Sequence, residues 1–332
     1  MVAPSPDPQV CVVIAAYNGA ATVGRAVASA LAQPQAAEVI VVDDASGDAT
    51  GAAAQAADDG SGRLSVLRLA QNGGPSRARN LAIEASRAPF VAILDADDLF
   101  LPGRLPSLLA VPDWDMVADD IAFVDESRAT DLDLAAIDSH NVTPRLLSAA
   151  DFVRGCLTRP DRYKGELGFL KPVMSRAFLD RHGLRYREEL RLSEDLDLYT
   201  RALLAGARFR IAPVCGYVAV ERSGSLSARH GVAELAAAEQ AVAALLAAAP
   251  AGTPVQTELR RLHAQAVRKH RLRAVLARKQ AIGAWAALRA EAPGARATAG
   301  VLADVARDKL RDARDRLLPR PAHDDSGPRF LL

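Results

Sequence analysis

Three carboxylates follow one apolar run of the sequence, at Asp95, Asp97 and Asp98. The run before them, Val91–Leu94, is typical of a buried strand, and ligands of open α/β sheets bind beyond the carboxyl ends of the strands. Carboxylates this close repel one another unless a cation lies between them. Mg²⁺ or Mn²⁺ would supply that charge and leave positions for phosphate oxygens. The alternative is a solvated acidic turn in which Asp98 caps the next helix.

A second acidic pair, Asp43 and Asp44, ends the apolar run Val39–Val42. A carboxylate at this place could accept an N–H group of a base or the hydroxyls of a ribose. The alternative is that Asp44 or Ser46 caps the following helix. Both interpretations are compatible if different residues take the two roles.

The segment Asn72–Asn80 (NGGPSRARN) combines a glycine-rich turn with a helix start. Its glycines permit a tight turn, and the first amides of the helix would face an anion. Arg77 and Arg79 could pair with phosphate or with the acidic clusters, and structural ion pairing is the simpler interpretation.

Two further acids, Glu194 and Asp195, follow Ser193 in the first turn of an expected helix. A carboxylate there that faces a cleft could act as a general base. The alternative is plain stabilisation of the helix start. Asp197 is expected to be a surface or ion-pairing residue.

The histidines show no spacing that indicates a metal site. His230 follows the flexible segment Ser223–Ser227 and could contact a metal or a phosphate, although a surface histidine is the simpler interpretation. Motifs of α/β hydrolases and P-loop ATPases are absent, and no Gly-x-Gly-x-x-Gly follows the first expected strand. The sequence therefore argues against a dinucleotide-dependent dehydrogenase and a P-loop ATPase.

The elements that must position these residues alternate between strand and helix in the first half of the chain. Apolar runs predict parallel strands, and the segments between them predict helices, so we expect a sheet covered on both faces. The expected strands are Val10–Ala16, Val39–Val42, Leu64–Leu69 and Phe90–Leu94, and the expected helices are Thr22–Gln33, Asp48–Ala57 and Pro75–Arg87.

The second half is less regular. A fifth strand is expected within Trp114–Val124, a polar loop over Ala129–Thr143, and a helix start at the capping box Ser148–Asp151. A helix from Ser193 should stop at Gly206. Pro213 is expected to separate two short strands, Arg208–Ala212 and Val214–Val220. The chain is expected to be helical from Val232, with a break at Pro293-Gly294 and one apolar stripe formed by Leu302, Ala306, Leu310, Ala313 and Leu317.

Composition indicates a globular protein. The chain has 332 residues, of which 50% are hydrophobic and 24% charged, which excludes collagen, disordered chains and disulfide scaffolds. Cys11, Cys156 and Cys215 form no CxxC pair, so we expect buried, reduced thiols in a cytosolic protein. No secretory signal is expected at the start, and Val232–Ala251 is too polar for a membrane span.

Together the motifs resemble glycosyltransferase family 2, the inverting enzymes with the GT-A fold. The resemblance is carried by VVIAAYNGAATVGRAVASAL, VIVVDDAS, NGGPSRARNLAIEAS, FVAILDADD and SEDLDLYTRAL, in the family's order. Leu167–Pro172 with Ser223–Ser227 is similar to bacterial exopolysaccharide transferases. The resemblance implies an α/β fold, a Rossmann-like, mostly parallel sheet flanked by helices, with an α-helical C-terminal extension.

The resemblance also implies how a nucleotide would be bound. Asp44 would bind the base, with uracil favoured and Asp43 nearby, and Ala15 and Tyr17 would line that pocket. Other family members carry a polar residue where Ala15 stands, so a donor other than a uridine nucleotide is compatible with the sequence. Arg79 belongs to the family pattern on the donor side.

The remaining implied roles concern the reaction itself. Asp95 and Asp97 match the Asp-x-Asp motif that holds Mn²⁺ or Mg²⁺ on the donor diphosphate, and Asp195 matches the general base, with Glu194 beside it. An inverting transfer passes through an oxocarbenium-like sugar, and a cation would stabilise the leaving diphosphate while a carboxylate accepts the proton of the acceptor. The absence of a Ser/His or Cys/His constellation agrees with this reaction, which needs no covalent nucleophile.

The implied domains are a GT-A catalytic domain over residues 1–228, a basic helical region over 229–319 and a flexible tail over 320–332. The catalytic domain would divide into a nucleotide-sugar half, 1–125, and an acceptor half, 126–228. The implied donor is a nucleotide sugar, with a UDP-sugar favoured. The acceptor would be a hydroxyl of a glycan or lipid-linked molecule, in exopolysaccharide or cell-envelope glycan synthesis.

The charge distribution bears on where such an enzyme would act. From Thr253 to Arg320 there are 16 Lys and Arg against 6 Asp and Glu, a net of +10, so the rest of the chain carries −9. The basic helices would form either a solvated cap or a surface that contacts anionic lipid. We expect a cytoplasmic enzyme, in the second case peripheral at the inner face of the plasma membrane.

Three other functions are compatible with parts of the sequence. A Mg²⁺-dependent phosphatase of the haloacid dehalogenase type also has Asp-x-Asp after an apolar strand, but there the motif usually opens the domain. A non-catalytic GT-A-like glycan-binding protein would not need Asp95, Asp97 and Asp195 together. Nucleic-acid binding is disfavoured because aromatic residues make up only 5% of the chain.

Overall fold

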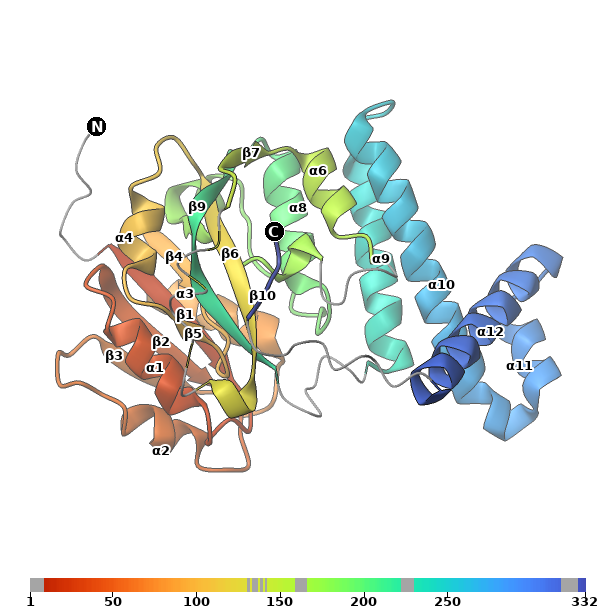
Figure 1. Ribbon diagram of the computed structural model, residues 1–332, viewed down its shortest axis with the longest axis horizontal. Helices are drawn as coiled ribbons and strands as arrows, with labels where there is room; N and C mark the ends of the chain where they lie inside the picture. The colour runs from red at the N-terminus through yellow and green to blue at the C-terminus, as the bar shows by residue number, and fades with distance from the viewer. Residues whose placement is uncertain are drawn as a thin grey trace. The chain divides into compact units, whose positions relative to one another are not determined.

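The computed structural model describes residues 9–129, 132, 137, 140, 142–158, 166–221, 230–317 and 328–332. It divides into two compact units (Figure 1). The first comprises residues 1–225 together with 328–332, and the second comprises residues 226–327. The first is an α/β unit and the second is helical. The predicted loop over 129–143 lies largely outside the described residues, and so does Ser223–Ser227.

Four parallel strands form the first half of the sheet, in the order β3-β2-β1-β4. They are β1 (Val10–Ala16), β2 (Ala36–Asp43), β3 (Leu64–Arg68) and β4 (Phe90–Ile93). The prediction of buried parallel strands is confirmed, since the side chains of Val10–Ile14 and Val39–Val42 are buried. Parallel pairing sets the carboxyl ends of β1 and β2 side by side, with Ala16 opposite Asp43.

The second half of the sheet is mixed, and its path continues β8-β6-β9-β5. It comprises β5 (Leu99–Phe100), β6 (Met116–Asp125), β7 (Arg145–Leu147), β8 (Val173–Ser175), β9 (Phe209–Glu221) and β10 (Arg329–Phe330). Strand β8 is antiparallel to both β4 and β6, whereas β6 and β9 are parallel. Strand β6 is the expected fifth strand within Trp114–Val124.

The expected break at Pro213 is wrong, because β9 runs through it as one strand. The register with β6 shifts here, from the pair Ala118 and Ile211 to the pair Asp120 and Cys215. Such an irregularity inserts extra residues on one strand, and it accommodates a proline, which has no N–H group to donate.

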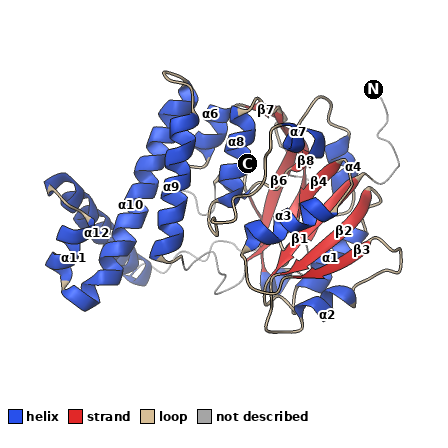
Figure 2. Cartoon of the chain, turned by 180° about the vertical axis from the view of Figure 1, so that it is seen from behind, coloured by secondary structure: helices blue, strands red, loops and turns tan. Residues whose placement is uncertain are grey.

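Helices cover both faces of the sheet, with α1 (Val23–Leu31) and α3 (Pro75–Ala85) on opposite faces (Figures 1 and 2). Ser148 caps α6 as expected, because its Oγ accepts the N–H of Asp151 at 3.1 Å. The other helices of this unit are α2 (Thr50–Gln55), α4 (Arg104–Leu109), α6 (Ala149–Gly155), α7 (Arg176–Arg181) and α8 (Glu194–Leu204), with short 3₁₀ turns at Glu126–Arg128 and Leu167–Phe169.

The last described residues return to the α/β unit, where β10 pairs with β6. The buried Asp120 Oδ1 accepts the N–H groups of Leu331 and Leu332 at 3.1 and 2.9 Å. The ring of Phe330 stacks on His140 at 3.7 Å, and His140 Nε2 lies 2.7 Å from Asp120 Oδ2. Residues 328–332 were predicted to belong to a flexible tail, but they contain strand β10 of the sheet.

The three cysteines are free thiols, and burial raises their pKa values, that of Cys11 to about 12. A thiol with a pKa near 12 is ionised to only about 10⁻⁴ at pH 8, so we expect the folded protein to resist iodoacetamide. Mass spectrometry should find no adduct on the native chain and three adducts in guanidinium. Rapid native labelling of the half-buried Cys215 would contradict this expectation.

The second unit consists of α9 (Val232–Ala248), α10 (Pro254–Ile282), α11 (Ala284–Glu291) and α12 (Ala295–Leu317). The expected break at Pro293-Gly294 is confirmed, and Gly294 has a φ of +91°. A small core holds the last three helices together through Val275, Ala287, Leu288, Ala292 and Val301. In contrast, Leu302, Ala306 and Leu310 of the predicted apolar stripe are exposed. Among the described residues, no helix combines the length and the apolar character needed to cross a bilayer.

Candidate active site

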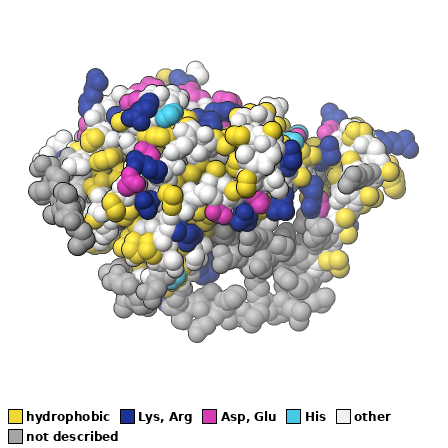
Figure 3. All heavy atoms as spheres, turned by 90° about the horizontal axis from the view of Figure 1, so that it is seen from above, with side chains coloured by type: hydrophobic (Ala, Val, Ile, Leu, Met, Phe, Trp, Pro, Cys, Tyr) yellow, Lys and Arg dark blue, Asp and Glu magenta, His cyan; other side chains and the backbone are white. Residues whose placement is uncertain are grey.

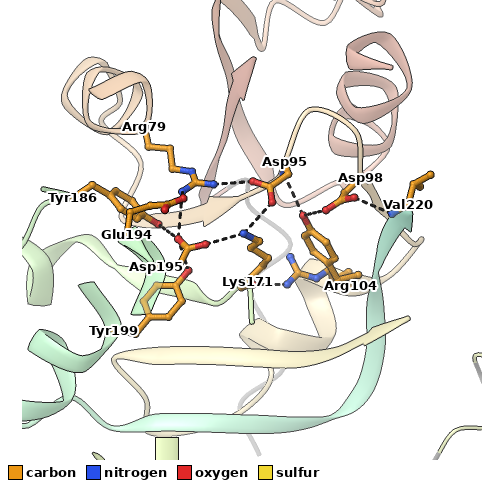
Figure 4. A network of polar contacts seen from close by, with 11 residues as sticks. Arg79, Asp95, Asp98, Arg104, Lys171, Tyr186, Glu194, Asp195, Tyr199 and Val220 are labelled. Carbon is orange, nitrogen blue, oxygen red and sulfur yellow. Dashed lines mark hydrogen bonds and ion pairs between the residues drawn. The ribbon is translucent and has the colours of Figure 1, made fainter. Parts of the chain in front are cut away.

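The fold brings Asp95 and Asp195 to opposite sides of one buried ammonium group (Figure 4). Asp95 follows β4, and Asp195 lies in the first turn of α8. Lys171 Nζ is 2.9 Å from Asp95 Oδ2 and 2.8 Å from Asp195 Oδ2. The two acids are 100 positions apart in the sequence, so only the tertiary structure places them at the same cation.

Arg79 forms the second cationic bridge of the site. Its guanidinium group contacts Asp95 Oδ1 at 2.8 Å, Glu194 Oε1 at 2.9 Å and Asp195 Oδ1 at 3.4 Å. The interpretation of Arg79 as an ion-pairing residue is thus confirmed, whereas Arg77 is exposed. Two cations face three carboxylates, so this cluster carries a formal net charge of −1.

Two tyrosines complete the surroundings of Asp195. Its Oδ1 accepts hydrogen bonds from the hydroxyls of Tyr186 at 3.0 Å and Tyr199 at 3.3 Å. Tyr199 lies one turn further along α8, and Tyr186 is clamped to α3 by two hydrogen bonds with Asn80. Both carboxylate oxygens of Asp195 are therefore oriented by named donors.

The position of Lys171 is itself fixed by a buried ion pair. Arg104 donates to Asp119 at 2.7 Å and to the carbonyl oxygen of Lys171 at 2.6 Å. The Arg104 guanidinium also lies over the Phe100 ring, 4.4 Å from its centroid. This arrangement fixes the backbone of Lys171, and the ammonium group of Lys171 contacts both acids.

The charges in this cluster stabilise one another. Burial opposes the charged form of Lys171, but Asp195 and Asp95 outweigh it and raise the pKa of the lysine. Burial likewise opposes ionisation of Asp95, yet Lys171 and Arg79 lower the pKa of that carboxyl. The lysine is therefore cationic and Asp95 is anionic at neutral pH.

One alternative from the sequence was that Asp98 caps the next helix, but its role in the structure is different. Its carboxyl group accepts hydrogen bonds from the Tyr217 hydroxyl at 2.7 Å and from the N–H of Val220 at 2.9 Å. It thereby ties the end of β4 to β9. Burial and the neighbouring charges of Asp97 and Asp95 raise the pKa of Asp98. Asp97 itself is half-buried beside it.

The acids after β2 hold a loop in place. Asp44 accepts the N–H groups of Gly73 and Gly74 at 2.7 and 2.8 Å. Asp43 pairs with Arg68 and accepts the N–H of Ser46 at 2.9 Å.

The alternative that Asp44 or Ser46 caps the following helix is wrong, because Asp48 Oδ1 accepts the N–H of Thr50 at 3.0 Å. Ser46 Oγ instead accepts the N–H of Asn18 at 2.9 Å.

The remaining predicted site residues lie in two places. Ala15 and Tyr17 are at the carboxyl end of β1, where Tyr17 is 46% exposed. His230 belongs to the helical unit, and its carbonyl oxygen accepts a hydrogen bond from Arg273 at 3.0 Å. Asp197 is ion-paired as expected, with Arg201 at 2.7 Å, although it is buried rather than on the surface.

Sequence reasoning missed Lys171, Tyr186, Tyr199 and Tyr217. Lys171 lies in the segment Leu167–Pro172, which resembles exopolysaccharide transferases, and no sequence pattern connects it with Asp95 or Asp195. Tyr199 could have been found, because a residue four positions after Asp195 lies on the same face of a helix. The other two tyrosines reach the site only through tertiary contacts.

Comparisons with known proteins identify the family of this chain. The family model described as Glycosyl transferase family 2 matches residues 11–135. Succinoglycan biosynthesis protein ExoU of Rhizobium meliloti (strain 1021) is 51% identical over 252 residues, which are 76% of this chain and 73% of the relative. Succinoglycan biosynthesis protein ExoO of the same strain is 37% identical over 230 residues, which are 66% of this chain and 63% of the relative.

Solved structures share the fold. TarS 1–349 of S. aureus, in complex with UDP, superimposes with a TM-score of 0.57 at 18% identity, over 79% of this chain and 71% of that one. Mannosyltransferase PcManGT from Pyrobaculum calidifontis, in complex with GDP-Man and Mn²⁺, gives a TM-score of 0.54 at 23% identity, over 93% of this chain and 83% of that one.

Proposed function

Because this chain belongs to glycosyltransferase family 2, we propose that it is an inverting transferase that moves a sugar from a nucleotide diphosphate to a hydroxyl group. The observation that supports this most is the placement of Asp195 across Lys171 from Asp95. In this proposal the donor diphosphate binds on the Asp95 side of Lys171 and the acceptor hydroxyl on the Asp195 side. Family membership as a glycosyltransferase contradicts the alternative of a haloacid dehalogenase phosphatase.

The proposed reaction uses Asp195 as the general base. The acceptor hydroxyl gives its proton to Asp195 while its oxygen forms a bond to the anomeric carbon. The bond from that carbon to the diphosphate oxygen breaks, and the nucleoside diphosphate leaves with the electron pair. Tyr186 and Tyr199 hold one oxygen of Asp195, and Lys171 holds the other. The acceptor hydroxyl would therefore replace Lys171 at the second oxygen.

We assign the binding of a divalent cation to Asp97, with Asp95 beside it. Mg²⁺ in such enzymes takes one or two carboxylates and completes its shell with substrate phosphates. Among the described residues, no group of three His, Cys, Asp or Glu side chains is placed to hold a metal ion. Asp95 would share the ion with Asp97, and its two carboxylate oxygens also contact Arg79 and Lys171. The bound ion would supply Lewis-acid stabilisation of the leaving diphosphate.

Asp97→Asn is expected to weaken the binding of UDP in the presence of Mn²⁺ on the order of 10–100-fold, the range seen for lesions in metal sites. Binding measured by calorimetry with EDTA should be the same for both proteins, because no metal is then present. An equal loss with Mn²⁺ and with EDTA would contradict the assignment. Asp98→Asn is unsuitable as a control, since Asp98 ties β4 to β9.

For the donor and acceptor, we propose a UDP-sugar and a glycan or lipid-linked acceptor in exopolysaccharide synthesis. The names of the two curated relatives support the pathway, and one structural neighbour was solved with UDP. Asp43, Asp44, Ala15 and Tyr17 would bind the nucleotide, and Asp44 also holds the loop around Gly73. The role of His230, which belongs to the helical unit, stays a prediction.

Thermal-shift measurements with a panel of nucleotide sugars and Mn²⁺ test the donor. A uridine nucleotide should raise the melting temperature more than a guanosine nucleotide does. A larger shift with GDP-mannose would contradict the uridine proposal without contradicting the proposed transfer reaction.

We further propose that the basic helical unit brings a cytoplasmic enzyme to an anionic membrane, where a lipid-linked acceptor would be found.

A further inference from the structure

The junction of α10 and α11 exposes a continuous apolar run, Ala281–Ala286 (AIGAWA). All six residues are exposed, with Ile282 at 49% and Trp285 at 71%. Single hydrophobic residues on a surface are ordinary, but a contiguous exposed run marks an interaction site. Gly283, with a φ of +80°, separates the two helices and turns the chain at this point.

The run is exposed because the core beneath it is already complete. Ala287 and Leu288 follow directly, and they pack with Val275 of α10 and Val301 of α12. Helix α11 therefore has one buried side, and Trp285 lies outside it. Among the described residues, the side chains of Ala281–Ala286 do not belong to the core formed around Val275 and Leu288.

Basic side chains surround the run in the sequence. From Arg268 to Arg289 there are seven Lys and Arg and no Asp or Glu. Arg278, Lys279 and Arg289 are exposed, and Arg278 pairs with Glu291 at 2.8 Å. Figure 3 shows Lys and Arg side chains beside hydrophobic ones on the helical unit, at the right of the view.

We propose that Ala281–Ala286 inserts into the interface of an anionic membrane, with Trp285 as its anchor. Tryptophan is favoured at the level of the lipid headgroups, and each Lys or Arg near an anionic surface adds to binding. A second copy of this chain would bring the same basic side chains against themselves, and an RNA would leave Ile282 without an apolar partner. This inference deepens the proposed membrane contact and rests on it.

The chain has two tryptophans, Trp114 and Trp285, which allows a direct spectroscopic test. In the full chain carrying Trp114→Phe, the emission reports Trp285 alone. We expect a blue shift on adding vesicles of phosphatidylglycerol and phosphatidylcholine, and no shift with phosphatidylcholine alone. Quenching by brominated lipid should place the ring at the headgroup level.

Co-sedimentation with the same vesicles separates insertion from charge attraction. Trp285→Ser should weaken vesicle binding about tenfold, since a large apolar side chain is no longer buried. Leu146→Ser is the matched control, because Leu146 is 56% exposed in the α/β unit, and it should bind as the wild type does. Lys279→Glu with Arg289→Glu should weaken binding at least about tenfold.

The remaining outcomes would overturn the inference. Vesicle binding without a change in Trp285 emission would refute insertion at this run and leave the membrane contact standing. No vesicle binding at all would refute both, while leaving the transfer reaction untouched. A blue shift caused by self-association without lipid, or by RNA, would assign the run to another partner.

Discussion

Asp195→Asn should reduce the rate of sugar transfer by about 10²–10⁴-fold, the usual contribution of a positioned general base. The amide has nearly the same shape as the carboxylate, so Tyr186 and Tyr199 can still donate to its oxygen. It cannot accept the proton of the acceptor. Initial rates with a saturating nucleotide sugar would measure the loss, and calorimetry should find nucleotide binding retained, because Asp195 lies across Lys171 from Asp95, where we propose that the donor diphosphate binds.

The neighbouring Glu194→Gln variant is the matched control. Glu194 pairs with Arg79, whereas the carboxylate of Asp195 is held by four donors, Arg79, Lys171, Tyr186 and Tyr199. We therefore expect a loss of less than about tenfold for Glu194→Gln, below the range of a general base. An Asp195→Asn protein that transfers at the wild-type rate would refute the proposed mechanism, and equal losses in both variants would leave the base unassigned.

Lys171→Met should destabilise the free enzyme by about 3–5 kcal/mol, the cost of breaking a buried ion pair from one side. The variant leaves Asp95 and Asp195 facing each other with Arg79 as the remaining cation. For a domain of this size, the melting temperature should fall by roughly 6–20 °C. Scanning calorimetry would measure the fall.

The double variant Lys171→Met/Asp195→Asn shows whether repulsion between the acids causes the loss. Removing one carboxylate relieves that repulsion, so the double variant should be more stable than Lys171→Met alone. Strictly additive losses would show that Lys171 contributes through packing instead. Lys171→Arg keeps the charge and should retain most of the stability.

Lys171→Met should also change how the free energy of unfolding depends on pH. Despite its burial, the pKa of Asp95 is held below that of an unfolded chain by Lys171 and Arg79. Its contribution is therefore present above the unfolded pKa of about 3.9 and is lost as the pH falls below it. In Lys171→Met this acid-dependent loss should be smaller. Urea titrations between pH 6 and pH 3 would compare the two proteins, and parallel curves would contradict the expectation.

The strands β1 to β4 and the helices between them followed from local patterns, because burial on both faces of a parallel sheet requires continuous apolar runs. Their carboxyl ends carry the acidic motifs, so the edge of the sheet that holds the site was predictable as well. The prediction was wrong at Pro213, because a shift of strand register depends on the partner strand β6. The alternative of a cap by Asp44 or Ser46 was wrong as well, because Asp48 accepts the first amide of α2 instead.

The sequence alone determined which acids follow β4 and which lie in the first turn of α8. It therefore also determined which family's reaction these acids are suited to. Only the tertiary structure decided what lies between them. Lys171 is 76 positions after Asp95 and 24 before Asp195, so no periodicity relates the three. Their contact arises because Arg104 holds the lysine backbone and the sheet brings α8 toward β4. Local patterns report the burial of each segment, whereas pairing of charges depends on which segments meet.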